Sequence, residues 1–278
     1  MKLKKTILYT LGIGLLLVGG AFTLSACSKS SASDVTTVTV GTSGAPKPFT
    51  YVANGKIKGY DIDTLRAVDK ILPKYKFEFK KTEFSSILAG LDSGRFQIGA
   101  NNFASNAERQ KKYYYSKPIF SDEYVIVVQK NDNSISKFAD IAGKTTVSSP
   151  GINFTTAIET FNKTASTKSK ITYSQEDPSK QIQDVQDGKY DYILVDKPLY
   201  NNYQKTYKYT NVKAIDLDTS DTKQISSTVP YSYLLISKTE DGKKLLKQVN
   251  KAITKIQENG TAKKISEKYF YGDYVPKK

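Results

Sequence analysis

Two hydrophobic periods alternate along the chain, and this alternation most constrains its fold. Apolar residues recur at every second position in Thr37–Val40, which is typical of a β-strand, and at helical spacing from Ile62 to Leu72. Asp61 is expected to cap this helix from its side chain. The pattern continues with a strand at Lys76–Lys80, a helix from Phe84 to Leu91 and a strand at Phe96–Ala100. Strands that alternate with helices favour a sheet with parallel strands and right-handed crossovers.

A long apolar strand is predicted at Tyr124–Gln129, and a second alternating set follows the polar segment 130–134. The predicted strands of this set are Thr145–Ser148, Ile171–Tyr173 and Asp191–Val195, and its predicted helices are Phe154–Phe161 and Pro178–Gln186. The chain is expected to cross between the two sets near 121–124 and again near 228–231. The sequence therefore predicts an α/β fold of two lobes, each a mixed, mainly parallel sheet flanked by helices, joined by two hinge strands. Lobe 1 is predicted to comprise 35–122 and 229–278, and lobe 2 to comprise 123–228.

The N-terminal segment has the pattern of a secretory signal. Three lysines precede the apolar run Ile7–Leu24, and the small-residue site Leu24-Ser25-Ala26-Cys27 follows. This ending resembles a bacterial lipobox, which implies cleavage before Cys27 and lipidation of that cysteine. We expect the mature protein to be held on the extracytoplasmic face of the cell membrane by this lipid anchor.

Residues 1–26 are accordingly predicted to be a signal peptide, and the small polar residues 27–34 a lipidated tether. The alternative is an uncleaved membrane anchor, because 18 mostly apolar residues almost span a bilayer. Four glycines within the run and the immediate small-residue site favour cleavage.

The composition excludes several chemistries. Cys27 is the only cysteine, and the chain has no histidine. A disulfide framework, a catalytic histidine and a histidine-based metal site are therefore ruled out for this chain, and the expectation is a binding protein without a cofactor rather than an enzyme. The formal net charge is +15, but the lysines are spread along the chain. Spread charge is typical of a solvated surface and does not indicate a nucleic-acid site.

Two charged residues, Arg109 and Asp196, are suited to bind the opposite charges of a zwitterion. Only three of the 42 basic residues are arginine, and Arg109 opens a helix after the strand that ends at Ala100. Its planar fork grips a carboxylate through two parallel hydrogen bonds. Asp196 directly follows a buried strand and supplies an anion for an ammonium group. The alternatives are a solvated Arg109 beside Glu108 and an Asp196 that caps the next helix.

Several motifs in order resemble the amino-acid-binding proteins of bacterial ABC importers over residues 36–270. They are Pro48-Phe49, Gly59-Tyr60-Asp61-Ile62-Asp63, the helix at Phe84, Glu108-Arg109 and Val195-Asp196. The resemblance implies a periplasmic-binding-protein-like fold of type II, in which the lobes close over the ligand. The family's carboxylate-binding arginine falls on Arg109 and its ammonium-binding aspartate on Asp196. The implied partners are an amino acid and the permease and ATPase subunits of an importer, and the expected state is a monomer.

The resemblance also assigns further contacts in lobe 1. It places the ring of Phe84 on the ligand, although a ring on a helical stripe is also a core residue in many proteins. Asn102 and Ala104 stand where relatives often have Ser or Thr, and Ser43 where they often have a polar contact. Pro46 replaces an aromatic ring that many relatives have, which implies a wider or differently shaped pocket.

In lobe 2 the resemblance places Asn153 at the start of a helix whose free N–H groups attract a carboxylate. The motifs of lobe 1 look closest to the cystine-binding branch of the family. The expected function is capture of a polar L-amino acid such as cystine. The chain has no ATP-binding P-loop, so a partner must supply the energy for import. The alternatives are a cationic surface adhesin that binds host or wall polymers, and a dehydratase of prephenate-like acids.

Overall fold

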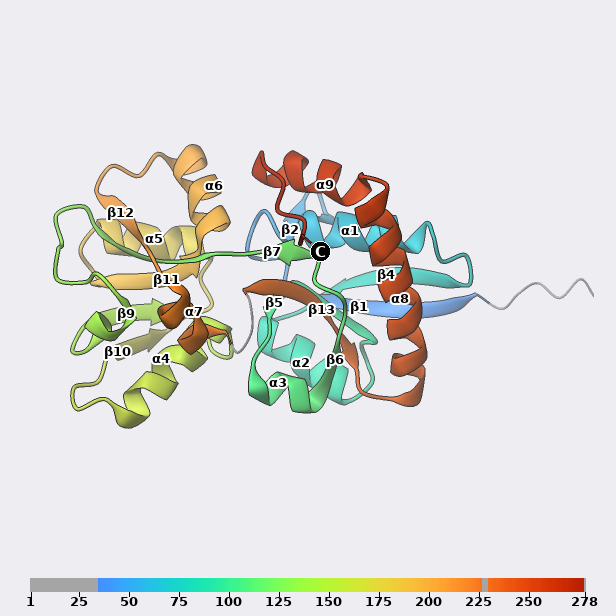
Figure 1. Cartoon of the computed structure of the whole chain (residues 1–278), viewed down its shortest axis with the longest axis horizontal. Coiled ribbons are helices and arrows are strands. Elements are labelled where there is room, and N and C mark those ends of the chain that lie inside the picture. The colour runs from blue at the N-terminus through green and yellow to red at the C-terminus, as the bar shows by residue number, and fades with distance from the viewer. Residues whose placement is uncertain (1–34, 227–229, 278) are drawn as a thin grey trace, which may run out of the picture. The chain divides into compact units, whose positions relative to one another are not determined.

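Two β-sheets, each flanked by helices, organise residues 35–226 and 230–277, which are the part of the chain that this computed structural model describes (Figure 1). The expectations for the signal peptide, the tether and Cys27 fall on residues outside this part. The two sheets form the two lobes of the α/β fold that the sequence predicts, and that prediction is confirmed.

The first lobe is built on a sheet with the strand order β4-β1-β5-β13-β6, and β7 also pairs with β13. Its strands are β1 (Thr36–Thr42), β4 (Tyr75–Lys81), β5 (Ile98–Ala104), β6 (Tyr113–Tyr115), β7 (Phe120–Ser121) and β13 (Tyr231–Ser237). Its helices are α1 (Tyr60–Asp69), α2 (Phe84–Asp92), α3 (Ala107–Lys112), α8 (Glu240–Glu258) and α9 (Thr261–Phe270). A small hairpin, β2 (Tyr51–Ala53) and β3 (Lys56–Lys58), turns at Asn54-Gly55.

The second lobe is built on a sheet with the strand order β10-β9-β11-β8-β12. Its strands are β8 (Tyr124–Gln129), β9 (Thr145–Ser148), β10 (Lys170–Tyr173), β11 (Tyr192–Asp196) and β12 (Val212–Asp216). Its helices are η1 (Phe138–Ile141), α4 (Asn153–Thr164), α5 (Pro178–Gln186), α6 (Lys197–Tyr207) and α7 (Thr219–Ile225).

Both sheets are mixed, because each combines parallel strands with a strand that runs antiparallel to its neighbours. In the first lobe β1 pairs parallel with β4 and β5, and the returning β13 pairs antiparallel with β5. In the second lobe β9 pairs parallel with β10 and β11, and β8 runs antiparallel to β11 and β12. The parallel strands place their carboxyl ends at one edge of each sheet, which is where ligands bind in α/β folds.

The chain passes from the first lobe to the second between β7 and β8, and returns between α7 and β13. The backbone N–H of Asp122, in the first passage, donates a hydrogen bond of 2.7 Å to the carbonyl oxygen of Pro230, in the second. This hydrogen bond holds the two passages side by side at Asp122 and Pro230.

Aromatic rings fill the first lobe below the hairpin. Phe49, Tyr60, Phe120 and Phe270 contact one another with ring-centroid distances from 4.7 to 6.4 Å. The Tyr60 hydroxyl is buried with them and donates a hydrogen bond to the carbonyl oxygen of Ile119. Burial of large rings is the main stabilising contribution at such a site. The ring cluster ties the Pro48-Phe49 loop to α1 and to the start of the inter-lobe passage.

The start of α1 differs from the sequence-based expectation. Asp61 is expected to cap this helix from its side chain, but the helix begins at Tyr60 and its cap position is Gly59. The backbone N–H groups of Tyr60 and Asp61 donate instead to the carbonyl oxygens of Pro48 and Phe49. The Asp61 side chain is consequently free to point into the protein, where it is fully buried.

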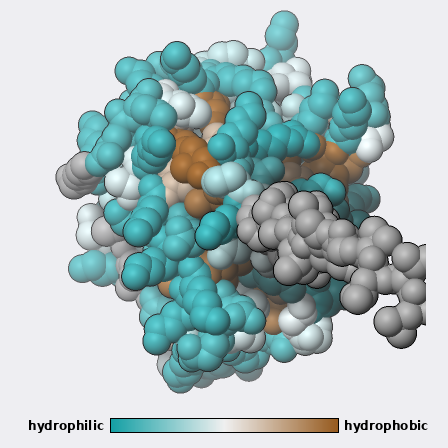
Figure 2. Space-filling view, turned by 90° about the vertical axis from the view of Figure 1, so that its right-hand side faces the viewer, coloured by the Kyte–Doolittle hydropathy of each residue, from teal (hydrophilic) through white to brown (hydrophobic). Residues whose placement is uncertain are grey.

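Polar side chains dominate the surface of the described residues. Figure 2 views the molecule from the right-hand side of Figure 1, and hydrophilic residues cover most of this face. Large exposed apolar side chains are scattered over separate elements: Val35, Val52, Tyr173, Tyr207 and Tyr271. In residues 35–226 and 230–277, no helix combines the length and the hydrophobicity that crossing a bilayer requires.

The fold requires a glycine at position 59. Its φ is +132°, and an added Cβ would lie 2.2 Å from the carbonyl oxygen of Phe49. We expect Gly59→Ala to lower the free energy of unfolding by about 2–4 kcal/mol, because both the backbone strain and the clash with backbone atoms must be relieved. Urea denaturation followed by circular dichroism measures this change.

The matched control is Gly55→Ala, since Gly55 also has a positive φ of +69° but an added Cβ there meets no atom within 4 Å. This variant should lose only about 1 kcal/mol. Equal losses in the two variants would contradict the close approach of Gly59 to the Phe49 loop.

Candidate functional site

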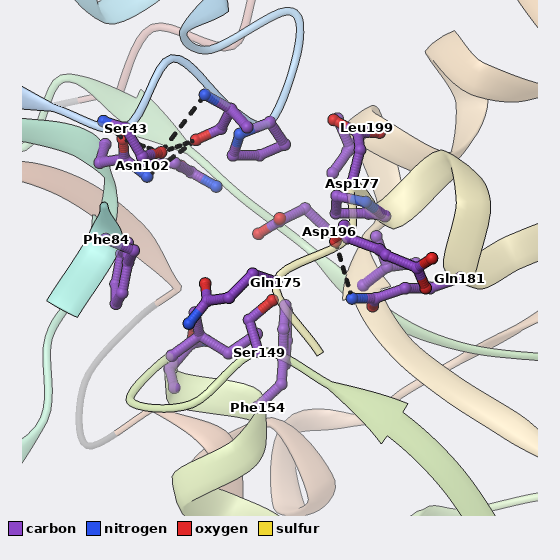
Figure 3. A pocket seen from close by; sticks show the side chains of 18 of the residues that line it. Ser43, Phe84, Asn102, Ser149, Phe154, Gln175, Asp177, Gln181, Asp196 and Leu199 are labelled. Carbon is purple, nitrogen blue, oxygen red and sulfur yellow. Dashed lines mark hydrogen bonds between the residues drawn. The ribbon is translucent and has the colours of Figure 1, made fainter. Parts of the chain in front are cut away.

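A cavity of about 460 Å³ lies between the two lobes (Figure 3). Its first-lobe wall comes from the ends of β1, β4 and β5 and from the starts of α2 and α3, and its second-lobe wall from the ends of β9 and β11 and the loops that follow β9 and β10. The predicted site residues that line it are Ser43, Phe84, Asn102, Arg109, Asn153 and Asp196. Its volume is within the range of pockets that enclose most of a small ligand.

Arg109 is buried at the boundary of the lobes, with 5% of its surface exposed. The side chain of Asn106 caps α3 by accepting a hydrogen bond of 2.8 Å from the Arg109 backbone N–H, which orients the residue. The guanidinium donates from Nη1 to the carbonyl oxygen of Ala104 at 3.1 Å, and from Nη2 to that of Gly151 in the second lobe at 2.5 Å. The alternative of a solvated Arg109 beside Glu108 is therefore wrong.

No carboxylate within the described residues pairs with the Arg109 guanidinium as a salt bridge. Its cationic group lies 5.9 Å from the ring centroid of Phe84 and 5.4 Å from that of Phe103. Burial lowers the pKa of Arg109, but an arginine remains charged throughout the physiological range. The site thus contains a desolvated cation that faces carbonyl oxygens and aromatic rings, and a bound carboxylate would stabilise it.

Asp196 ends β11 and is buried, with 6% of its surface exposed. It occupies the position before α6 but makes no side-chain capping hydrogen bond, so the alternative of a simple helix cap is wrong. Burial raises the pKa of Asp196, and hydrogen bonds with the side chains of Asp122 and Asn102 oppose that rise.

Asp122, in the first inter-lobe passage, forms a carboxyl pair with Asp196. Burial raises the pKa of Asp122 well above its ordinary value, and the nearby charge of Asp196 raises it further. Two buried carboxyl groups in contact do not both ionise readily, so the pair favours a single shared proton. The stronger rise at Asp122 favours Asp196, which lines the cavity, as the anionic member.

Asn102 has a left-handed backbone conformation, with φ of +49°. Asn adopts this region more readily than most residues. Its backbone N–H donates to Asp61 Oδ2 at 2.7 Å, which holds the turn in place. The side-chain Oδ1 of Asn102 is buried and has no hydrogen-bond partner among the described residues. An unpaired buried acceptor is costly, and an ammonium group in the cavity would satisfy it.

Asn153 is the first residue of α4 and supplies a complementary donor from the second lobe. It is 9% exposed, and its Nδ2 atom is buried without a hydrogen-bond partner in the described part of the chain. The first N–H groups of α4 are also free of intrahelical partners, and the helix dipole favours an anion there. A carboxylate between Arg109 and Asn153 would therefore contact donors from both lobes.

Phe84 begins α2 at the cavity wall. Its ring centroid lies 5.4 Å from that of Phe103. An added Cβ on Gly151 would lie 3.9 Å from Phe84 Cε1, so this ring reaches the second lobe. Ile87 and Leu91, on the same stripe of α2, are buried in the core instead. Phe84 is thus the member of the stripe that lines the cavity.

Ser43 and Ala104 have different roles from those the resemblance implies. The Ser43 hydroxyl donates to the carbonyl oxygen of Ala45 at 2.6 Å and is 2.8 Å from Asn101 Oδ1, so Ser43 lines the cavity but its hydroxyl orders the loop after β1. Ala104 is not among the residues lining the cavity. Ala104, which the resemblance places among the ligand-binding residues, contributes the carbonyl oxygen that accepts a hydrogen bond from Arg109.

Other lining residues were missed by sequence reasoning. They include Lys81 and Glu83 from the first lobe and Gln175 and Glu176 from the second. The signal that would have found them is positional, because Lys81 ends β4 and Gln175 follows β10 at the carboxyl edges of their sheets. In residues 35–226 and 230–277, no group of three or more acidic, histidine or cysteine side chains has an arrangement suited to a metal ion.

Two lobes that enclose a cavity with a buried cation on one wall and a buried anion on the other define a solute-binding protein. The chain belongs to the bacterial extracellular solute-binding proteins, family 3, whose model matches residues 38–272. Members of this family act outside the cytoplasm, and the fold and the family together establish the amino-acid-importer resemblance found in the sequence.

The chain is similar to several characterised relatives. It is 34% identical over 238 residues to the L-cystine-binding protein TcyA of Bacillus subtilis, covering 85% of this chain and 82% of TcyA. A solved structure from work on glutathione import in Gram-positive bacteria via GshT and the cystine ABC importer TcyBC of Streptococcus mutans is 39% identical, with a TM-score of 0.80. That similarity covers 87% of this chain and 98% of the solved one. A putative L-cystine ABC transporter structure from Listeria monocytogenes is 28% identical, with a TM-score of 0.74, covering 87% and 99% of the two chains.

Asp61 should make the stability of the protein depend on pH. Burial raises its pKa from 3.8 to about 7. The folded state therefore holds the proton more tightly than the unfolded state, and stability falls as the pH rises between these two values. We expect Asp61→Asn to reduce the loss of unfolding free energy between pH 5 and pH 8 by about 2–3 kcal/mol, as measured by urea denaturation at both pH values.

Asp132→Asn is the control for this experiment, because hydrogen bonds with Ser134 lower the pKa of Asp132. Asp132 is then ionised in both the folded and the unfolded protein before the pH reaches 5. Its replacement should therefore leave the loss of unfolding free energy between pH 5 and pH 8 unchanged. An Asp61→Asn protein that loses as much stability as the unmodified protein would contradict the raised pKa.

Proposed function

We propose that this protein binds a polar L-amino acid, with L-cystine as the favoured ligand, and delivers it to the permease and ATPase subunits of an ABC importer. Arg109 binds the α-carboxylate together with Asn153, and Asp196 binds the α-ammonium together with Asn102. Phe84 packs against the ligand between these polar contacts. The observation that carries the proposal is a buried guanidinium from the first lobe and a buried carboxylate from the second on the walls of one cavity.

The choice of cystine has two supports. Bacillus subtilis TcyA, named an L-cystine-binding protein, matches most of this chain at 34% identity. Pro46 lines the cavity, and it lacks the bulk of the aromatic ring that its place implies in relatives. Glutathione is the second candidate, because the structure at 39% identity comes from work on glutathione import.

Binding without chemical turnover fits the inner carboxyl groups. Asp61 is engaged by the backbone N–H of Asn102, and Asp122 by Asp196 and by the backbone N–H of Glu123. Asp61 Oδ1 has no hydrogen-bond partner among the described residues, but neither Asp61 nor Asp122 is among the residues that line the cavity. The relatives are solute-binding proteins, and they give no support to the adhesin alternative.

The site assignment is tested with Arg109→Ala and Asp196→Asn. We expect Arg109→Ala to weaken L-cystine binding at least 100-fold in isothermal titration calorimetry, because the ligand carboxylate would be buried without a cation. Arg95→Ala is the matched control, since Arg95 is exposed and its guanidinium contacts the ring of Phe96 away from the cavity. Unchanged affinity in Arg109→Ala would exclude this site.

The membrane anchor is a separate proposal that concerns the segment outside the described residues. We expect Cys27→Ser to release the protein from the membrane fraction of expressing bacteria, because the sulfur that carries the lipid is replaced. Immunoblots of membrane and soluble fractions measure this, with Ser28→Ala as the control that keeps the cysteine. A Cys27→Ser protein that remains with the membrane would favour an uncleaved anchor.

A further inference from the structure

The cavity extends beyond the buried charges to an outer wall formed by Lys81, Glu83, Gln175 and Glu176. All four side chains are exposed, whereas Arg109 and Asp196 are buried, so the outer wall lies at the solvent side of the same cavity. Figure 3 shows Gln175 in the space between the lobes, with Phe84 on one side and Asp177 on the other. A ligand bound at Arg109 and Asp196 would thus extend towards these residues.

The charges of the outer wall lack partners in the described protein. The side-chain ammonium of Lys81 and the side-chain carboxylate of Glu83 make no hydrogen bond or ion pair with another described residue. By contrast Lys80, the neighbour of Lys81 on β4, lies 3.8 Å from Glu78. The stem of Lys81 packs over the turn at Gly44, where an added Cβ would be 3.4 Å from Lys81 Cε. This packing holds the ammonium at the cavity edge.

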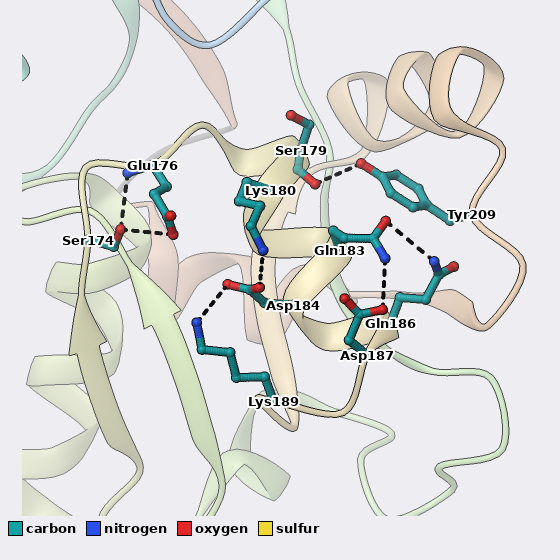
Figure 4. A network of polar contacts seen from close by, with 10 residues as sticks. All are labelled: Ser174, Glu176, Ser179, Lys180, Gln183, Asp184, Gln186, Asp187, Lys189 and Tyr209. Carbon is teal, nitrogen blue, oxygen red and sulfur yellow. Dashed lines mark hydrogen bonds and ion pairs between the residues drawn. The ribbon is translucent and has the colours of Figure 1, made fainter.

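The Glu176 carboxylate also forms no ion pair within the part of the chain that the structure describes. Its carboxylate accepts a hydrogen bond of 3.3 Å from the Ser174 hydroxyl (Figure 4). Lys180 is close in sequence, but it pairs with the buried Asp184, which also accepts from Lys189. Lys180 and Lys189 therefore pair with Asp184 and not with Glu176. Glu176 remains available to a cation in the cavity.

The charge balance of the cavity differs from that of the protein. The chain has a formal net charge of +15, but the cavity is lined by four carboxyl groups and two cations. Asp177 is used by the fold, because it caps α5 and accepts from the Tyr203 hydroxyl. After the inner pair of Arg109 and Asp196, the remaining charges are one ammonium, on Lys81, and two carboxylates, on Glu83 and Glu176.

We propose that the outer wall is a second charged subsite and that the preferred ligand is a bis-zwitterion, an amino acid with an α-amino-acid head at each end. Lys81 binds the second carboxylate, and Glu83 and Glu176, from opposite lobes, bind the second ammonium. This inference rests on the proposed function, in which Arg109 and Asp196 hold the first head. With two such subsites, closure of the lobes would depend on both ends of the ligand, because each head would contact side chains from both lobes.

The test compares ligands that have a second amino-acid head with one that lacks it. L-cystine and L,L-cystathionine carry two heads, and S-methyl-L-cysteine keeps the inner half alone. We expect Lys81→Met to weaken calorimetric binding of the two-headed ligands about tenfold, because one charge-assisted contact is lost. Binding of S-methyl-L-cysteine should change less than twofold. Lys80→Met, one residue away and outside the cavity lining, is the matched control and should leave every affinity unchanged.

Replacement of both acids distinguishes a second ammonium from a second carboxylate. The double variant Glu83→Gln and Glu176→Gln should weaken L-cystine several-fold but spare glutathione, which has two carboxylates and a single ammonium. The inference is overturned if Lys81→Met leaves L-cystine binding unchanged or weakens S-methyl-L-cysteine equally. It is also overturned if the unmodified protein binds glutathione or single-headed amino acids but neither two-headed ligand.

Failure of this inference is distinct from failure of the proposed function. Loss of L-cystine binding in Arg109→Ala together with unchanged binding in Lys81→Met contradicts the second subsite alone. Retained binding in Arg109→Ala contradicts the inner site itself. Thermal unfolding of each variant shows whether a loss of binding comes from a loss of fold.

Discussion

The burial of Arg109 without a carboxylate partner among the described residues is the constraint on which the site depends. Removing a guanidinium from water is costly, and two carbonyl oxygens and two aromatic rings compensate for that cost only in part. The surrounding fold has to hold the side chain there. The short helix α3, its Asn106 cap and the carbonyl of Ala104 all serve this purpose, and the second lobe completes the enclosure with the carbonyl of Gly151.

The anionic side of the cleft is organised by a different principle. Three buried aspartates, Asp61, Asp122 and Asp196, come from α1, the inter-lobe passage and β11. Burial raises the pKa of all three, and the charge of Asp196 raises the pKa values of Asp61 and Asp122 further, which favours a negative charge on Asp196, the member that lines the cavity. Asn102 is placed among them, because its backbone binds Asp61 and its amide contacts Asp196.

Much of the fold follows from periodicity in the sequence. The stripe Ile62, Leu65 and Val68 is fully buried, as the helical spacing from 62 to 72 indicates, and the strand pattern before Asp196 places that residue at the edge of a sheet. Local patterns did not reveal the position of Asp61, because its partner Asn102 lies 41 residues further along the chain and only the packing of α1 on β5 brings them together.

The same limit applies to the outer part of the cavity. Lys81 is one of many lysines in a basic chain, and nothing in its sequence neighbourhood separates it from Lys80. The difference is three-dimensional, since successive side chains of a strand point to opposite faces. Ala104 shows a related limit, because the sequence does not reveal that its carbonyl oxygen accepts a hydrogen bond from Arg109.

The hydrogen bond from Arg109 to the carbonyl of Gly151 joins the two lobes through the side chain that the proposed ligand would use. A peptide oxygen carries only a partial charge, whereas a carboxylate forms a stronger, charge-assisted hydrogen bond with a guanidinium. A ligand carboxylate that took the place of Gly151 on Arg109 would therefore replace a weaker contact between the lobes with a stronger one of its own.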